Sequence, residues 1–161
     1  MSLLPALATA QVVISEVFAW TSVGNNPTDE FIELCNTGLV DEDVSGWTVT
    51  DGDLLDSLLA WSSHESTLSA PTGSNLILDS TVITAGSCAL VLDPNYVDGS
   101  QPHSIPEGTV ILTVGTATNQ AIGDGLDTGD PVSLFNSFGT TSAYLVDTYG
   151  TPSTSGDWDS F

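Results

Sequence analysis

Short apolar segments in which side chains alternate every two residues recur along the chain, and turn-forming residues separate them. Within residues 30–36, Ile32 and Leu34 fall on one face of a strand, and Glu33 and Cys35 fall on the other. Because helical periodicity is scarce, the pattern predicts an all-β fold, with about eight short strands arranged as a β-sandwich. The predicted strands are residues 11–20, 30–36, 47–50, 75–78, 87–92, 109–114, 131–135 and 143–149.

Residues 54–73 are the least strand-like part of the chain. The spacing of its apolar residues, at 54–55 and 58–61, allows one or two helical turns. The same residues also suit a loop whose leucines and tryptophan cover an open end of the sandwich. We favour the covering loop.

The length of 161 residues suits one domain, which we place at residues 11–150. Residues 1–10 look like the second half of a secretory signal, since Ala8 and Ala10 precede Gln11 as small residues precede a cleavage site. The alternative is an N-terminal tail. Residues 151–161 are rich in Gly, Ser and Thr and are expected to be an exposed C-terminal tail or a domain exit. The protein is therefore expected to be secreted or held at the cell surface.

The charge balance narrows the choice of partners. The chain has 21 Asp and Glu residues and no Lys or Arg, for a net charge of −21, whereas about a quarter of an average domain is charged, with both signs present. Each carboxylate must therefore be solvated, bonded to a backbone N–H, or held by a bound cation. Nucleic acid and anionic membranes are unsuitable partners because binding to them depends on Lys and Arg. A protein partner or another copy of the chain remains.

No pattern typical of catalysis is present in the sequence. A nucleophile needs a base beside it and a third group to orient that base. The two histidines, His64 and His103, fall in expected loops without paired spacing, and no phosphate-binding or nucleophile-elbow motif occurs. We therefore expect that the chain is not an enzyme.

Calcium is the candidate cofactor, because it binds carboxylate oxygens arranged in glycine-containing loops. The candidate ligands are Asp51, Asp53 and Asp56 in one loop and Asp124, Asp127 and Asp130 in another. Neither loop matches an EF-hand. The alternative is that these are solvated turn aspartates, and Asp130 also suits a strand entry that accepts backbone N–H bonds.

Two cysteines, Cys35 and Cys88, lie in separate apolar segments. In an exported protein they would form one disulfide across the sandwich, and in a reducing compartment they would be buried thiols. Their spacing does not predict a zinc site.

Several segments, in order, resemble the lamin-tail domain found in bacterial secreted proteins and nuclear lamins. They are residues 12–17 (VVISEV), 29–38 (DEFIELCNTG), 44–51 (VSGWTVTD), 83–92 (ITAGSCALVL), 129–135 (GDPVSLF) and 145–150 (LVDTYG). The resemblance implies an immunoglobulin-like sandwich and structural roles for Glu33, Gly46, Trp47 and Gly129. A large ring at Trp47 beside a small residue also suits a buried position.

These observations lead to three functional hypotheses. The first is a non-catalytic extracellular binding module of lamin-tail type, acidic and with calcium as its candidate ligand. The second is a self-assembling surface or fibre subunit, which polymerises by edge pairing or by donating residues 4–20 to a neighbour. The third is an accessory domain of a secreted nuclease-like or phosphatase-like protein.

Overall fold

Every regular element of the described chain is a β-strand, apart from one turn of 3-10 helix, η2 (Trp61–Ser63). This confirms the all-β prediction. The computed structural model describes residues 11–19, 30–52, 54–64, 71, 75–94, 96, 104–115, 122, 125–126, 129, 131–136 and 144–150. The strands are β1 (Val12–Phe18), β2 (Phe31–Asn36), β3 (Glu42–Asp43), β4 (Thr48–Thr50), β5 (Leu55–Ala60), β6 (Val82–Ile83), β7 (Cys88–Leu92), β8 (Val110–Val114), β9 (Val132–Phe135) and β10 (Leu145–Tyr149).

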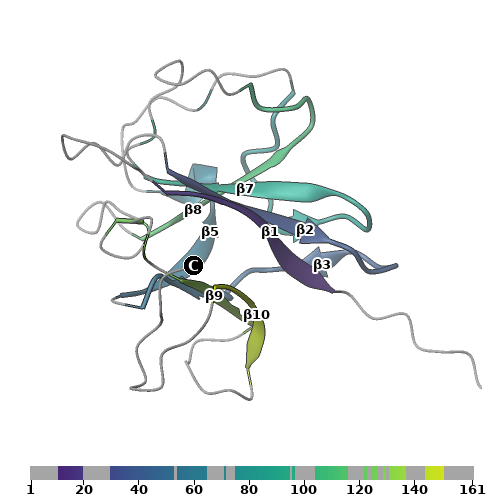
Figure 1. Cartoon of the computed structure of the whole chain (residues 1–161). Helices are drawn as coiled ribbons and strands as arrows, with labels where there is room; N and C mark the ends of the chain where they lie inside the picture. Colours follow the sequence, from purple (N-terminus) through teal and green to yellow (C-terminus); the bar gives the residue numbers. More distant parts are fainter. Residues whose placement is uncertain are drawn as a thin grey trace, which may run out of the picture.

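Eight of these strands form one large sheet in the order β1-β2-β7-β8-β5-β4-β9-β10 (Figure 1). All neighbouring pairs are antiparallel except β7 and β8, which are parallel. The sheet curls until its two edge strands, β1 and β10, come into contact, so that it is nearly closed into a barrel. The remaining two strands, β3 and β6, form a small separate sheet.

A side chain joins the two edges of the large sheet. The Ile14 backbone N–H of β1 donates to Asp147 Oδ2 of β10 over 2.8 Å. Both strands are irregular here, because β1 has a register shift between Ile14 and Glu16 and β10 has one between Leu145 and Asp147. The carboxylate thus takes the place of a ladder hydrogen bond between the edge strands, and it leaves less of each edge open to pairing with another chain.

Replacing Asp147 with alanine should lower the free energy of unfolding by about 1–3 kcal/mol, because the partly buried Ile14 N–H would lose its charged acceptor. Urea unfolding followed by circular dichroism would measure the difference. Asp79→Ala is the control, since it makes the same substitution at an exposed aspartate elsewhere. Equal losses of unfolding free energy in the two variants would show that Asp147 does not stabilise the contact between β1 and β10.

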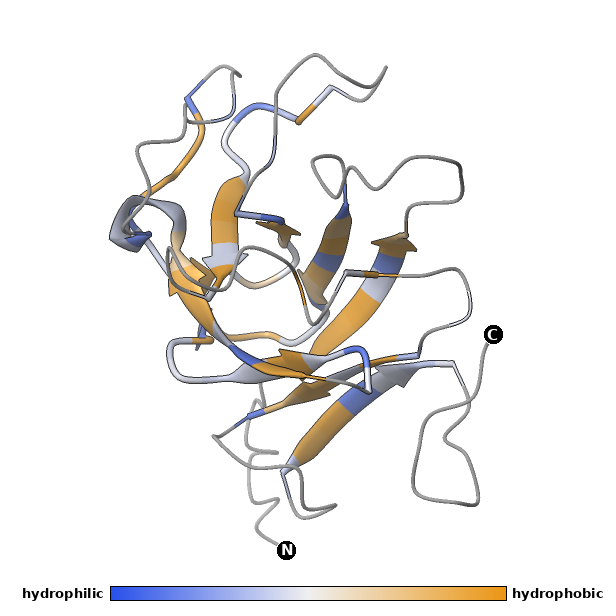
Figure 2. Cartoon of the chain, turned by 90° about the vertical axis from the view of Figure 1, so that its left-hand side faces the viewer, coloured by the Kyte–Doolittle hydropathy of each residue, from blue (hydrophilic) through white to orange (hydrophobic). Residues whose placement is uncertain are grey.

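Apolar side chains cover both faces of part of the sheet. The interior of the nearly closed sheet holds a large apolar cluster, and Figure 2 shows the apolar residues concentrated on the strands. Its largest fully buried members are Ile32, Leu34, Leu58, Ile83, Leu112, Ile122, Leu134, Val12, Val44 and Val49. A second cluster lies on the outer face and contains Phe31, Trp61, Leu92, Tyr96 and Ile111. Strand β8 is buried throughout: Val110, Leu112 and Val114 belong to the interior cluster and Ile111 to the outer cluster. Thr113 is buried as well, and its hydroxyl donates to the Leu92 carbonyl.

The covering loop predicted for residues 54–73 is wrong, since β5 lies inside this segment and pairs with β4 and β8 in the middle of the sheet. Asp56, Leu58 and Ala60 are the buried residues of β5. The alternation was hidden in the sequence because an aspartate occupies the first of these inward positions. Trp61, which follows at once, packs in the outer cluster.

One other predicted strand needs correction, and two short strands were missed. Residues 75–78 contribute only an isolated parallel bridge between Ile77 and Val110. Strands β3 and β6, which were not predicted, have two residues each and are too short to show alternation.

Asp43 Oδ1 accepts hydrogen bonds from Thr81 Oγ1 (2.6 Å) and from the Ser45 N–H (3.0 Å). The Thr81 hydroxyl and, next, the Ser45 N–H lower the pKa of Asp43, and the Thr81 bond links the β3 segment to the β6 segment.

Candidate ligand-binding site

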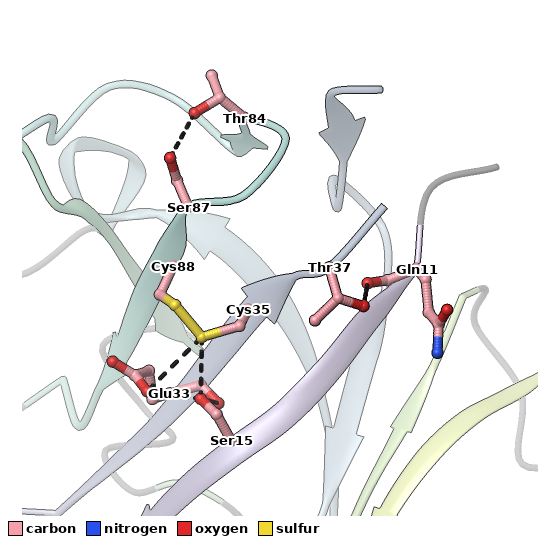
Figure 3. Close-up of a disulfide and its surroundings, with 8 residues drawn as sticks. All are labelled: Gln11, Ser15, Glu33, Cys35, Thr37, Thr84, Ser87 and Cys88. Atoms are coloured by element: carbon pink, nitrogen blue, oxygen red, sulfur yellow. Dashed lines mark hydrogen bonds between the residues drawn. A yellow bond between two sulfur atoms is a disulfide. The ribbon is translucent and has the colours of Figure 1, made fainter. Parts of the chain in front are cut away.

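The structure joins Cys35 and Cys88 in a disulfide between β2 and β7 (Figure 3). The two residues are register partners on neighbouring antiparallel strands. Of the two alternatives left by the sequence, the structure has the disulfide, but the bond lies within one sheet and does not join two layers of a sandwich. Both side chains are half-buried on the outer face, the face that Glu33 also occupies.

A bulge in β1 brings a second acidic side chain to this face. Strict alternation from Val12 and Ile14, which point inward, would also turn Glu16 inward. The register shift after Ile14 adds one residue, so that Val17 packs against the interior core instead. Glu16 is exposed and becomes the register partner of Glu33 on β2.

Glu16 and Glu33 are thus two carboxylates directly opposite each other on paired strands. Like charges in this position destabilise a sheet, and the chain has no Lys or Arg to offset them. The extra residue of the bulge, Ser15, donates its hydroxyl proton to Glu33 Oε2 over 2.5 Å and lies 3.1 Å from Cys35 Sγ. This contact fixes one oxygen of Glu33 beside the disulfide, as Figure 3 shows.

A cavity of about 240 Å³ opens beside this acidic pair on the outer face of β1, β2 and β7. Its lining residues are Glu16, Phe31, Glu33, Leu90, Leu92, Tyr96, Ser104, Ile105 and Pro106. Leu90 is the register partner of Glu33 on β7, and the next pair on the same face is Phe31 with Leu92. Phe31 stacks on Phe18 with ring centroids 5.4 Å apart. The site thus combines an apolar floor with carboxylates, a combination suited to an amphipathic cationic group.

Glu33, Cys35 and Cys88 bring three possible metal-ligating atoms within 4.8 Å of one another. Both sulfur atoms are bonded in the disulfide, so neither is available as a thiolate ligand. This cluster therefore does not fit a metal ion while the disulfide is intact.

The structure describes two of the six predicted calcium ligands. Asp51 and Asp56 lie in the β4–β5 hairpin, and each is 3% exposed. Asp51 Oδ1 accepts the Leu54 N–H over 3.3 Å. In the described ranges, neither belongs to a group of three possible ligands within 4.8 Å. Asp53, Asp124, Asp127 and Asp130 lie outside the described residues, as does His103, so calcium binding stays a prediction.

The predicted structural residues differ in their surroundings. Trp47 is 9% exposed and packs in the interior core. Gly46 adopts φ +74°, a conformation that favours glycine, and a Cβ there would meet no atom within 4 Å. The backbone conformation, and not a close approach of another group, is thus the reason for glycine. Gly129 is half-buried two residues before Pro131, and its role stays a prediction.

Sequence reasoning missed the buried acidic residues at one end of β2. Glu30 Oε2 accepts the Leu126 N–H over 3.0 Å, and the Glu30 carbonyl accepts the Asp93 N–H over 3.3 Å. Both acidic side chains are buried. The available signal was the alternation itself, because it places Glu30 on the inward face with Ile32 and Leu34. Glu16 had no such signal, since the bulge reverses its face.

Helices long and apolar enough to span a membrane are absent from the part of the chain that the structure describes. A family model described as a domain of unknown function (DUF8705) matches residues 10–159. A search of curated proteins finds no match.

Proposed function

Since the chain belongs to the DUF8705 family, we propose from its own geometry that it is a non-catalytic, extracellular, protein-binding module. One observation carries this proposal: an apolar cavity with two carboxylates, Glu16 and Glu33, on a sheet face stapled by a disulfide. We refer to this cavity and its lining residues as the acidic pocket. It offers groups that recognise a ligand.

The size of the acidic pocket favours a protein partner over a free small molecule. Its volume of about 240 Å³ lies below the range of about 300–1,000 Å³ that is typical of small-molecule sites. A single side chain projecting from a partner surface suits a cavity of this size. The disulfide supports an extracellular location, because disulfides persist in oxidising environments. The lamin-tail resemblance, with its immunoglobulin-like sandwich, remains a proposal of the same kind.

Binding to a different protein is better supported than self-assembly. Edge pairing would need open strands, whereas β1 and β10 contact each other through Asp147 and Ile14. Donation of residues 4–20 to a neighbour would require β1 to leave its pairing with β2. An accessory role beside a catalytic domain fits within this proposal, since the partner surface can belong to such a domain.

Selection from a random peptide library against the immobilised, oxidised protein tests the proposed function. We expect selected peptides to lose binding to the Leu90→Trp variant, in which the indole ring fills the acidic pocket. Ile105→Trp fills it from the opposite wall and serves as a second variant, and circular dichroism would verify that each is folded. A library without binders, or binders unaffected by both folded variants, would contradict a binding role for this face.

A further inference from the structure

We propose that the acidic pocket receives an arginine side chain of the partner protein, with the guanidinium between Glu16 and Glu33 and the aliphatic stem on the apolar floor. This inference rests on the proposed function and names the group that is recognised. It starts from the fact that the two acids are register partners on β1 and β2.

The two carboxylates of the pocket favour a cationic ligand. Side chains opposite each other on antiparallel strands have Cβ atoms about 4.5–5.5 Å apart, so two carboxylates in this position repel each other. Ser15 satisfies part of one of them by donating to Glu33 Oε2. A guanidinium that hydrogen-bonds to both carboxylates would convert the repulsion into two charge-assisted contacts.

The apolar walls select arginine over a smaller cation. Phe31 and Tyr96 line the cavity together with Leu90 and Leu92. An arginine carries three methylene groups that pack on leucine, and its planar head stacks on aromatic rings while it donates in a fork. A lysine ammonium is a compact, strongly hydrated charge that gains less from such walls. The cavity volume of about 240 Å³ has room for one side chain of this kind.

The occupant cannot be an arginine of a second copy, because the chain contains no Lys or Arg among its 161 residues. Its net charge of −21 also repels other copies while it attracts basic surfaces. The partner surface therefore lies on another domain or another protein, and it presents an arginine beside apolar residues. Its association with this chain is expected to weaken as salt rises, because Glu16 is exposed and Glu33 is only half-buried.

An NMR titration of the oxidised, ¹⁵N-labelled protein tests this inference. The probe is a capped pentapeptide with one central arginine between two leucines, and the matched control peptide carries citrulline, which has the same shape without the charge. We expect amide shifts at Glu16, Glu33 and Leu90, and a dissociation constant at least about tenfold lower for the arginine peptide. Glu16→Gln and Glu33→Gln should each weaken its binding by about fivefold or more, whereas Asp79→Asn, an exposed acid elsewhere, should not.

The outcomes separate this inference from the proposed function. If both peptides bind equally and Leu90→Trp abolishes both, the pocket binds an apolar side chain; the inference is then wrong and the proposed function stands. Absence of binding by the arginine peptide, or shifts confined to other residues, also overturns the inference, and the peptide library then decides the proposed function independently. Binding of the arginine peptide that is unchanged in both Glu→Gln variants would likewise overturn it.

Discussion

Replacing Cys35 and Cys88 together with alanine is expected to lower the free energy of unfolding by about 4 kcal/mol. The disulfide joins positions 53 residues apart, and a crosslink that closes a loop of this length removes much of the entropy of the unfolded chain. It also fixes the register of β2 on β7, the two strands that carry much of the acidic pocket. Urea unfolding of both proteins under oxidising conditions would measure the difference.

A chemical control is available for this prediction, because the chain has only two cysteines and both are in the bond. Dithiothreitol should shift the unfolding midpoint of the unaltered protein towards that of the double variant and should leave the double variant unchanged. A double variant whose unfolding free energy differs by less than about 1 kcal/mol would contradict the expected contribution of the loop.

Leu58→Ala is expected to lower the free energy of unfolding by about 2–5 kcal/mol. Leu58 is 1% exposed and belongs to the interior core. Truncation removes buried apolar surface and leaves a cavity that the closely paired strands β4 and β8 cannot readily fill. Urea unfolding followed by tryptophan fluorescence would report the loss, and two buried tryptophans, Trp47 and Trp61, provide the signal.

Leu54→Ala makes the matched control, because it is the same substitution four residues earlier at a side chain that is 45% exposed. Its loss should be a small fraction of that at Leu58. If the unfolding free energy of both variants fell equally little, residues 54–60 would behave as a covering loop, and the central position of β5 in the sheet would be refuted.

The alternation of residues 30–36 was enough to predict β2 and its two faces, because both faces of this strand carry strong local signals. Ile32 and Leu34 lie in the interior, and Phe31 lies in the outer cluster. Strand β5 was not predictable in the same way, since the buried Asp56 interrupts its apolar face. The parallel pairing of β7 with β8 depends on the path of the whole chain, and local patterning contains no information about it.

The candidate site was predictable only in part. Cys35, Cys88 and Glu33 were identified from the sequence, although Glu33 was assigned a structural role. Glu16 was missed because its face depends on a bulge. The opposite wall of the cavity, residues 104–106, lies in an irregular segment, and its approach to β2 and β7 is a long-range contact without a local signature. Recognition of the pocket therefore required the three-dimensional arrangement.

The bulge in β1 also has a consequence for comparing this chain with its relatives. Because Ser15 is the extra residue, a shortened strand and a bulged strand can present the same glutamate outward. A relative that keeps both glutamates but lacks the residue at position 15 would pair regularly here, with its glutamate still outward and its valine inward, and it would lose the hydroxyl that binds Glu33. Alignments of this family should therefore place a single-residue gap in this strand at the bulge, where it removes the serine contact and keeps the acidic pair.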